Sequence, residues 1–270
     1  MSVPKQTLAA DSNQQDEQNR AVYHAHNVLW YYRRKSMLPV EVACLQKYES
    51  AWLGRDVLDI GVGTGRTSRF FAPRTRRYVA VDYSPVMLNY IKKHLPEIEI
   101  RQMDFRDLSE FADGFFDFVF ATANVIDALT HDGRMRALRE SCRVLRPDGV
   151  LAFSTHNLNY KSAFSGPHLE WSWNPVRLAS KTVQFVLGSW NYRRIGPLRA
   201  RTPEYALLND TGHFYACLHY YAARPTVRAQ IEAAGMRLLD VFDPQGRTLA
   251  VNDDDREDPW LLYVAQRVAG

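Results

Sequence analysis

The chain has 270 residues, of which 46% are hydrophobic and 24% charged, and its formal net charge is +4 at neutral pH. This length and composition suffice for one α/β domain with a sizeable core, or for such a domain with an insertion. The small positive charge does not by itself indicate a nucleic-acid partner. No apolar run reaches the ~18 residues of a membrane span and no signal peptide opens the chain, so we expect a soluble, cytoplasmic protein without a membrane partner.

The three cysteines do not form a recognisable framework. Cys44, Cys142 and Cys217 are odd in number and widely separated, which fits neither a set of disulfides nor a zinc site. We interpret all three as ordinary thiols.

The N-terminal part changes character near residue 20. Residues 1–20 are polar and poor in aliphatic side chains, which predicts a disordered tail. Residues 21–53 begin with an aromatic segment that includes Tyr23 and Tyr31, and their pattern predicts a helical region. These aromatic side chains either pack the helix on the sheet or contact a ligand.

A glycine motif follows the first predicted strand, at residues 55–60. Gly61, Gly63 and Gly65 occupy alternate positions, where glycine allows a sharp turn and leaves no Cβ to keep a ligand away. Asp82 ends the next predicted strand, at 77–82, and a carboxylate there can accept both hydroxyls of a ribose. The pair predicts a nucleotide-cofactor site.

The spacing of this motif departs from that of a nicotinamide dinucleotide site. The dinucleotide fingerprint needs its third glycine at the position of Arg66, and here an acidic residue, Asp59, also precedes the glycines. A different cofactor is therefore favoured.

Short apolar runs alternate with segments of helical period through the middle of the chain, which predicts a doubly wound α/β sheet. The further expected strands are 98–103, 115–121, 149–155, 237–242 and 261–266, and the expected helices are 66–71, 85–94, 134–145 and 225–234. With the two strands above, this predicts a seven-stranded sheet.

The segment 156–223 has a different composition. It holds twelve of the 33 aromatic residues and seven basic residues against three acidic ones. Such a mixture can hold a flat or acidic small molecule, can bind single-stranded nucleic acid, or can simply form a satellite core beneath solvated arginines. Apolar residues from Val176 to Trp190 recur at helical spacing, which is typical of packing, with a membrane-surface role as the alternative.

At Asp59, Gly61, Gly63 and Gly65 the chain resembles the class I S-adenosylmethionine (SAM)-dependent methyltransferases, whose first motif is D-x-G-x-G-x-G. The resemblance implies that the glycines lie against the methionine part of SAM. The remaining implied cofactor residues are Asp82 at the ribose, Tyr83 and Met87 after it, Asp104 at the adenine amino group, Phe105 beside the adenine ring, and Asn124 after strand four.

The resemblance covers residues 54–155 and, more loosely, 224–270. It implies a Rossmann-like, mostly parallel sheet with an antiparallel last strand, formed by these two segments as one SAM-binding domain. It also implies that the helical region 21–53 lies over the cofactor as a lid, and that 156–223 is an inserted, aromatic-rich substrate-recognition cap.

Methyl transfer requires the acceptor to be held against the methyl group, and a hydroxyl acceptor also needs a base. His156 lies at the end of strand five, and His213 has Asp210 three residues before it. Both histidines are candidate catalytic residues. Candidate substrate-binding residues are Tyr31, Asn157, Trp173 and Tyr215.

Several methyltransferase classes are disfavoured by the sequence. Residues 121–124 lack the Asp/Asn-Pro-Pro-aromatic motif of enzymes that methylate base amino groups, and none of the cysteines follows a proline, as carbon-5 cytosine enzymes require. A catechol-type metal site needs several carboxylates, and Asp127 stands alone, so we predict no metal.

The sequence therefore predicts an enzyme that transfers a methyl group from SAM to an oxygen or nitrogen of a small molecule, leaving S-adenosylhomocysteine. Three alternatives stay open: an enzyme that uses SAM without methyl transfer, such as a cyclisation that releases methylthioadenosine; an RNA methyltransferase; and a non-catalytic SAM-binding scaffold. The sequence does not predict the oligomeric state.

Overall fold

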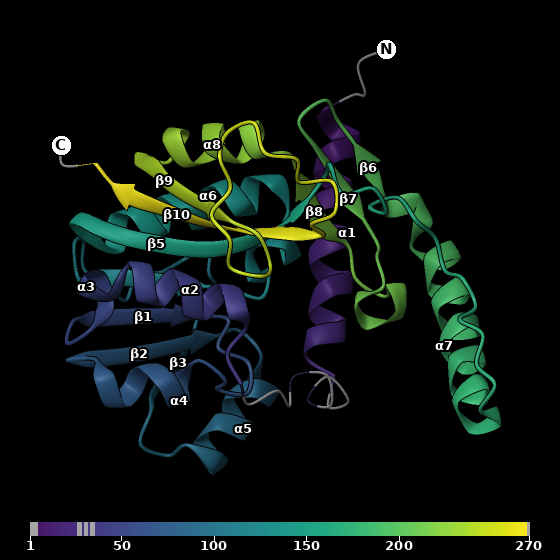
Figure 1. The fold of residues 1–270 in the computed structure, drawn as a ribbon, viewed down its shortest axis with the longest axis horizontal. Coiled ribbons are helices and arrows are strands. Elements are labelled where there is room, and N and C mark those ends of the chain that lie inside the picture. The colour runs from purple at the N-terminus through teal and green to yellow at the C-terminus, as the bar shows by residue number, and fades with distance from the viewer. Residues whose placement is uncertain (1–4, 26–28, 30–31, 33–35, 269–270) are drawn as a thin grey trace.

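A computed structural model describes residues 5–25, 29, 32 and 36–268, with the side chains of the first helix described from residue 14 onward. One large sheet crosses the molecule, and helices lie on both of its faces (Figure 1). The helices are α1 (Lys5–Tyr23), α2 (Pro39–Lys47), α3 (Glu49–Trp52), α4 (Ser68–Phe71), α5 (Pro85–His94), α6 (His131–Val144), α7 (Pro175–Arg194) and α8 (Arg224–Ala233). The strands are β1 (Asp56–Ile60), β2 (Arg77–Asp82), β3 (Glu99–Gln102), β4 (Phe116–Ala121), β5 (Leu145–Asn157), β6 (Ala200–Arg201), β7 (Tyr205–Leu208), β8 (His219–Ala222), β9 (Met236–Phe242) and β10 (Trp260–Arg267).

Seven of these strands form the predicted Rossmann-like core. Strands β3, β2, β1, β4 and β5 are parallel neighbours in that order, and β10 runs antiparallel between β5 and β9. The parallel strands carry apolar residues on both faces, as expected of a sheet covered by helices on each side. The predicted α/β fold with an antiparallel last strand is confirmed.

The sheet separates two hydrophobic cores, because successive side chains of a strand point to opposite faces. Leu58 of β1 and Val79 of β2 join the core beneath α6 and α8. Their neighbours Val57 and Ala80 join the core beneath α2, α3, α4 and α5. The ligand-binding edge is therefore held by elements that are buried on both sides.

The helix boundaries follow local signals in the sequence. Helix α5 begins at Pro85, as predicted from Ser84-Pro85, and α8 is followed by Gly235 with a positive φ of 87°. Helix α6 begins three residues before the predicted start at 134. The Thr130 hydroxyl accepts a hydrogen bond from the backbone N–H of Gly133, and this cap sets the true beginning.

The segment predicted as an inserted cap also extends the sheet. Strand β8 pairs in parallel with the last two residues of β5, His156 and Asn157, and β7 and β6 follow it in antiparallel order. The sheet thus has ten strands among the described residues instead of seven. The weak two- to four-residue strands gave no periodic signal long enough to be recognised from sequence.

The N-terminal prediction was wrong, because residues 5–23 form helix α1 where a disordered tail was expected. The helix docks through amides instead of an apolar face. Asn19 Nδ2 donates to the carbonyl oxygens of Ala128 and Leu218, and Asn19 Oδ1 accepts from the Leu218 N–H at 2.9 Å. Within 21–53 the described helices are the end of α1, which includes Tyr23, and α2 and α3.

No helix in the described ranges combines the length and the apolar composition needed to cross a bilayer.

A buried ion pair joins α6 to the loop after β4. The side chains of Arg134 and Asp127 are fully buried, and Arg134 Nη1 lies 2.8 Å from Asp127 Oδ1. Arg134 Nε also donates to Gln230 Oε1 at 2.8 Å, and the guanidinium lies over the Tyr220 ring. Loss of either partner leaves an uncompensated charge in the core.

We expect Arg134→Ala to lower the free energy of unfolding by about 3–5 kcal/mol, because it strands the Asp127 carboxylate. Urea denaturation followed by circular dichroism measures this loss. Arg136→Ala removes an exposed arginine from the same helix and should change stability by less than about 0.5 kcal/mol. Equal effects of the two changes would contradict the importance of the buried pair.

Candidate cofactor and acceptor site

A pocket opens at the carboxyl ends of β1, β2 and β4. It encloses about 1200 Å³ of empty space including its mouth. The walls come from α1, the glycine loop, the ends of β2 and β3 and the turn after β4. Its lining includes Asp16, Asn19, Arg20, Tyr23, Tyr32, Asp59, Gly61, Gly63, Thr64, Asp82, Tyr83, Met87, Asp104, Phe105, Arg106 and Ala123.

The glycine loop has the backbone that the motif predicts. Gly61 and Gly63 have positive φ values of 67° and 56°, and a Cβ on Gly61 would collide with the side chain of Val125. Gly65 has a different role, because its α-carbon faces Leu95 and Ser68 and it does not line the pocket. Two glycines therefore shape the pocket and the third allows close packing behind it.

Arg66 stands where a dinucleotide site would have its third glycine, and its side chain anchors the glycine loop. Its guanidinium pairs with the buried carboxylate of Glu41 in α2, with Nη2 2.7 Å from Oε1. The Thr122 hydroxyl, at the end of β4, donates to the same Oε1 at 2.7 Å. The loop is thereby tied to α2 and to the strand beside it.

Asp82 connects the loop to the end of β2. Its Oδ2 accepts a hydrogen bond from the Gly63 N–H and its Oδ1 from the Ser84 N–H, both at 2.9 Å. Burial raises its pKa, against the effect of these two backbone donors. A carboxylate has about four lone-pair sites, so capacity remains for a pair of ligand hydroxyls.

Asp59 is held by protein groups. Its Oδ2 accepts hydrogen bonds from the hydroxyls of Thr67 and Tyr78, the latter at 2.5 Å. Burial raises the pKa of Asp59 to about 6. It lines the pocket, and its role as a cofactor ligand stays a prediction.

The expected adenine end of the pocket is closed by ion pairs with α1. Asp104 Oδ2 lies 2.6 Å from Arg20 Nη2 and 2.7 Å from Arg106 Nη2, and Arg106 also pairs with Asp16. Burial favours the neutral acid, but hydrogen bonds from Arg106 outweigh it and lower the pKa of Asp104. Helix α1 thus forms the wall that was expected from residues 21–53.

Three other residues predicted to bind the cofactor line the same end. Phe105 and Met87 are buried, and Tyr83 lies between α1 and the pocket with its ring 5.5 Å from the Arg20 guanidinium. Their contact with adenine is a prediction.

Beside this pocket, Asp127 orients His156. His156 Nδ1 and its backbone N–H both lie 2.7 Å from Asp127 Oδ2, while Asp127 Oδ1 accepts from the Thr155 hydroxyl and from Arg134. A proton on Nδ1 satisfies this geometry and leaves Nε2 as an acceptor. Asn124 Nδ2 lies 3.3 Å from that Nε2, consistent with the same tautomer.

A second carboxylate faces His156 from the insertion. Asp210 Oδ2 lies 3.6 Å from His156 Nε2, 2.9 Å from His219 Nδ1 and 2.7 Å from the Tyr221 hydroxyl. Burial opposes the charge on His219, but the Asp210 carboxylate outweighs it and raises the pKa of His219 well above its usual range. Asp210 and His219 therefore form a buried ion pair at neutral pH.

Asp210 was expected to orient His213, and this was wrong, because it orients His219 instead. His213 Nε2 lies 3.0 Å from the Tyr32 hydroxyl. Burial, aided by the positive charge of His219, lowers the pKa of His213 to about 4, so this imidazole is neutral at pH 7. The side chain lies next to the ring of Tyr23, which lines the pocket.

Two turns with left-handed backbone border this region. Ala123 and Asn124 have φ of 57° and 59°, and His213, Phe214 and Tyr215 have φ of 49°, 53° and 61°. Non-glycine residues in this conformation cost roughly 1–3 kcal/mol each and gather at functional sites. Asn124 also has a buried Oδ1 with no hydrogen-bond partner in the described part of the chain.

The ring nitrogens and carboxylate oxygens of His156, Asp210 and His219 lie within 4.8 Å of one another, which is close enough to hold a metal ion. The Asp210 charge is already balanced by His219, so the cluster is satisfied as a hydrogen-bonded ion pair. The expectation that no metal binds stays a prediction.

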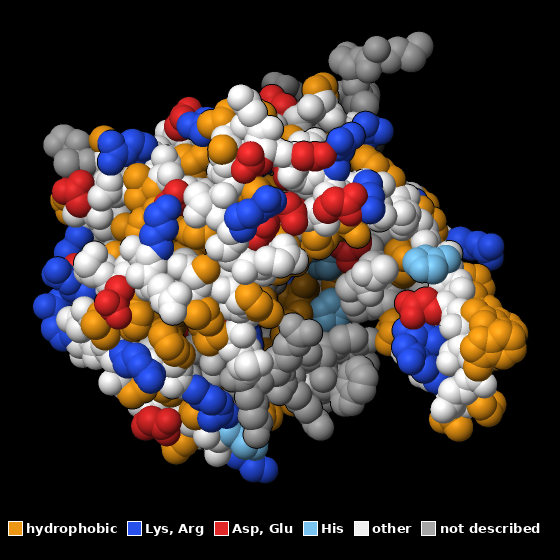
Figure 2. All heavy atoms as spheres, in the orientation of Figure 1, with side chains coloured by type: hydrophobic (Ala, Val, Ile, Leu, Met, Phe, Trp, Pro, Cys, Tyr) orange, Lys and Arg blue, Asp and Glu red, His pale blue; other side chains and the backbone are white. Residues whose placement is uncertain are grey.

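Histidine side chains are visible in a recess near the centre of the molecular surface (Figure 2). Tyr23 connects the two halves of the site, because it lines the pocket and its hydroxyl lies 3.4 Å from His219 Nε2. Sequence reasoning missed Arg20, Thr64 and His219. Their partners lie up to 196 residues away in the chain, and no local pattern indicates such contacts.

The three predicted substrate-binding residues that the structure describes do not line the pocket. Trp173 is 92% exposed, before α7, and its ring meets only Trp171 edge-on among the described rings. Asn157 is buried and uses its amide to hold the backbone of Asp255 and Asp258. Tyr215 packs against Tyr192 and Gly188 of α7, and Tyr31 lies outside the described residues.

A doubly wound sheet with a glycine loop and a carboxylate at the ends of its first two strands defines an α/β protein that binds a nucleotide-type cofactor. Residues 57–149 match the family model described as "Methyltransferase domain". The chain thus carries a class I SAM-dependent methyltransferase domain, whose cofactor is SAM.

Curated relatives agree with this family. A probable S-adenosylmethionine-dependent methyltransferase of Mycobacterium tuberculosis is 34% identical over 103 residues, which are 38% of this chain and 36% of that protein. A ubiquinone biosynthesis O-methyltransferase of Actinobacillus pleuropneumoniae is 28% identical over 129 residues, 46% of this chain and 55% of that protein. The alignments thus span about a third to a half of these relatives.

The fold is also that of a solved structure of Burkholderia thailandensis 1,6-didemethyltoxoflavin-N1-methyltransferase, with bound 1,6-didemethyltoxoflavin and S-adenosylhomocysteine. The TM-score is 0.56 at 15% sequence identity, over 100% of this chain and 92% of that chain.

We expect Asp59→Asn to gain stability over the wild type as pH rises. The pKa of Asp59 is about 6 in the folded protein and 3.8 as a model value, so the carboxyl stabilises the fold fully below pH 3.8 and loses that contribution as pH rises through 6. The difference in unfolding free energy between variant and wild type should grow by about 2 kcal/mol from pH 4 to pH 8, because part of the effect is already present at pH 4. Urea denaturation at both pH values measures it.

Asp132→Asn is the matched control, because it neutralises an exposed carboxyl. Its difference from wild type should stay below about 1 kcal/mol across the same range. A flat difference for Asp59→Asn would show that burial does not perturb this group.

We expect Asp82→Ala to weaken SAM binding by ~10- to 150-fold, because ~1.5–3 kcal/mol is lost when a hydroxyl pair loses a charged acceptor. Calorimetric titration measures the affinity. Asp113→Ala, which removes an exposed carboxylate, should leave it unchanged. Unaltered affinity in Asp82→Ala would remove this residue from the cofactor site.

Proposed function

We propose that this protein transfers a methyl group from SAM to an oxygen or nitrogen of a small molecule, leaving S-adenosylhomocysteine. The observation that carries the proposal is the Asp127–His156 pair at the end of β5. Neither residue lines the pocket of the glycine loop and Asp82, but Asn124 links the pair to it. Asn124 lies between the pocket-lining Ala123 and Val125, and its Nδ2 is 3.3 Å from His156 Nε2. A positioned proton acceptor beside a SAM pocket is what a hydroxyl or ammonium acceptor requires.

The pocket's own residues support SAM as the ligand. The left-handed glycines leave room for the backbone to approach it, Asp82 offers free lone pairs, and buried apolar side chains such as Met87 and Phe105 suit a flat ring. When bound, SAM supplies an electrophilic methyl group.

The protein's contribution is position, removal of water and proton transfer. A proton leaves the acceptor and is taken by His156 Nε2, while Nδ1 keeps its own proton on Asp127. The resulting imidazolium is stabilised by the Asp127 carboxylate, which lies 2.7 Å from Nδ1 and also pairs with Arg134. Asp210, 3.6 Å from Nε2, further stabilises that charge.

We assign the base to His156 instead of His213. A histidine whose pKa is about 4 is a weak base at pH 7, whereas His156 has a carboxylate that orients it, with Asp127 Oδ2 2.7 Å from His156 Nδ1. His213 is better suited to hold Tyr32 and Tyr23 at the border between cofactor and acceptor.

We propose a hydroxylated, flat acceptor as the substrate class. The ionised Asp210–His219 pair, the Tyr221 hydroxyl and the buried Asn124 Oδ1 offer polar contacts, and the rings of Tyr23 and Tyr221 offer apolar ones. The A. pleuropneumoniae relative carries an O-methyltransferase name, which favours an oxygen acceptor.

We also propose that the protein acts in the cytoplasm. Its three cysteines are all unpaired, and two of them, Cys44 and Cys217, are buried. Unpaired thiols persist in a reducing compartment.

The function is tested by incubating the protein with SAM and a panel of phenols, carboxylic acids and amines, with mass spectrometry of every product. The expected result is S-adenosylhomocysteine together with an acceptor that carries one added methyl group. Methylthioadenosine would instead indicate cyclisation of the cofactor. SAM binding without turnover on any acceptor would indicate a scaffold, and RNA affinity that falls steeply with salt would indicate an RNA enzyme.

With an acceptor in hand, we expect His156→Gln to lower kcat by ~10²- to 10⁴-fold, the usual contribution of a positioned base. Calorimetry should show unchanged SAM affinity in this variant. His94→Gln, an exposed histidine on α5, is the control and should keep full activity. Full activity in His156→Gln would show that the acceptor needs no base at this position.

A further inference from the structure

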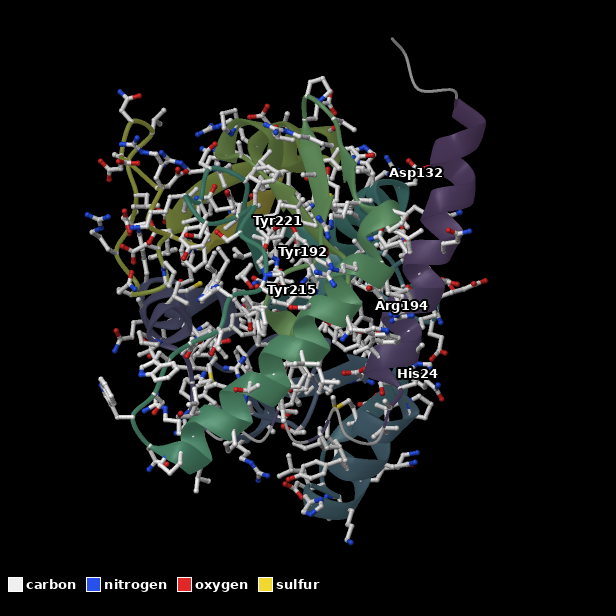
Figure 3. All side chains as sticks on the ribbon, turned by 90° about the vertical axis from the view of Figure 1, so that its right-hand side faces the viewer. His24, Asp132, Tyr192, Arg194, Tyr215 and Tyr221 are labelled. Carbon is white, nitrogen blue, oxygen red and sulfur yellow. The ribbon has the colours of Figure 1, made fainter. Side chains whose placement is uncertain are left out.

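Helix α7 stands apart from the rest of the molecule. In Figure 1 it projects beyond the sheet and its covering helices, and Gly188 is its only fully buried residue. Contacts with the body come from one side, where Tyr192 meets Tyr215 edge-on and Asn191 Nδ2 donates to the Phe214 carbonyl at 2.9 Å. Figure 3 shows Tyr192 and Tyr215 together behind the helix.

The opposite side of α7 carries a continuous exposed apolar stripe. Val176, Val183 and Trp190 are 80%, 57% and 61% exposed, and Ala179 and Val186 lie between them. Figure 2 shows hydrophobic side chains along the outer edge of this helix. Of the thirteen large hydrophobic residues exposed in the described chain, nine lie between Phe164 and Trp190.

The spacing of the stripe is that of a helix that packs on another helix. Residues 176, 179, 183, 186 and 190 follow intervals of three, four, three and four, which is the seam of a coiled-coil pair. A shallow hollow along the same side is lined by Phe185, Val186, Ser189, Trp190, Arg193 and Arg194, and can receive a side chain from a partner helix. The Arg194 guanidinium lies over the Trp190 ring, 4.9 Å from its centroid, so this end of the stripe is both apolar and basic.

We propose that this stripe, the α7 seam, is the dimer interface of the protein, with α7 packed antiparallel against α7 of a second copy. A two-fold axis at Val183 places Val176 opposite Trp190 of the partner subunit and Ala179 opposite Leu187 of the partner subunit. Small residues then face large ones along the seam, so the same surface is complementary to itself.

The charges agree with this antiparallel arrangement. Beside the seam, Ser180, Thr182 and Ser189 are uncharged, and the charged residues that border it, Arg193 and Arg194, lie only at its Trp190 end. Two copies in antiparallel order therefore do not oppose like charges along most of its length. Arg193 and Arg194 lie at one end of the helix, where a parallel pair would bring them together and an antiparallel pair keeps them apart. Antiparallel helix dipoles favour the same choice.

The exposed area is large enough for a stable dimer. Trp171, Trp173 and Trp190 are all more than half exposed, and an aromatic side chain buries ~150–250 Å² when it is covered. With the valines of the seam, this approaches the ~800 Å² that each partner contributes to a standard interface. A membrane surface is the competing occupant: Glu170 neutralises Lys181 at 2.7 Å, and three other basic residues of α7, Arg177, Arg193 and Arg194, remain, so the vesicle arm of the test distinguishes the two.

The test is the mass of the full chain by light scattering across micromolar concentrations. The wild type should have twice the 31.1 kDa of one chain. Val183→Asp places two carboxylates together at the axis and should give a monomer with unchanged SAM affinity. Val251→Asp, at a valine 77% exposed elsewhere, is the matched control and should stay dimeric.

Cysteine cross-linking then tests the orientation without relying on disruption. Under oxidation Val183→Cys should form a disulfide-linked dimer, whereas Val176→Cys should not, because an antiparallel pair separates the two copies of residue 176. Cross-linking at both positions would overturn the antiparallel arrangement. A monomeric wild type, or a monomer that sediments with phosphatidylglycerol vesicles, would overturn the proposal.

Discussion

The Asp127 carboxylate is the group on which both the fold and the site depend. One of its oxygens balances the buried charge of Arg134, and the other holds the ring and the backbone of His156. A buried ion pair is costly to separate, so α6, the turn after β4 and the end of β5 must keep one arrangement. The same constraint that fixes these elements also fixes the imidazole ring that we propose as the proton acceptor.

The site has two halves that come from different parts of the topology. The cofactor half lies at the ends of the parallel strands, where doubly wound sheets bind ligands, and α1 closes it with Arg20 and Tyr23. The proposed acceptor half arises because β8 continues the edge of β5 beyond the end of β4, which brings His219 and Tyr221 beside His156. In this proposal the inserted segment contributes to the site through its strands instead of through its tryptophans.

What the sequence could predict depended on the distance between interacting residues. Apolar runs and spacings of a few residues indicate the parallel strands, the glycine loop and Asp82. The structure has these features where they were predicted. Helix α1 was not predicted, because it docks through Asn19 and other polar groups. Its polar composition is the same as that of a solvated, disordered tail. The Asp210–His219 pair was not predicted either. The two side chains meet only because the turn at 211–218, with its left-handed residues, brings them together.

The docking of α1 also affects how the chain acquires its structure. This helix leaves the ribosome before the sheet does, and the backbone of Leu218, to which Asn19 bonds, is made 199 residues later. At roughly 5–20 residues per second that delay is on the order of ten to forty seconds. The helix docks through polar groups that need Leu218 as a partner, so this wall of the cofactor pocket is completed only after Leu218 has been made. A nascent chain that has already formed β1 and β2 therefore holds an open, incomplete pocket until β8 has emerged.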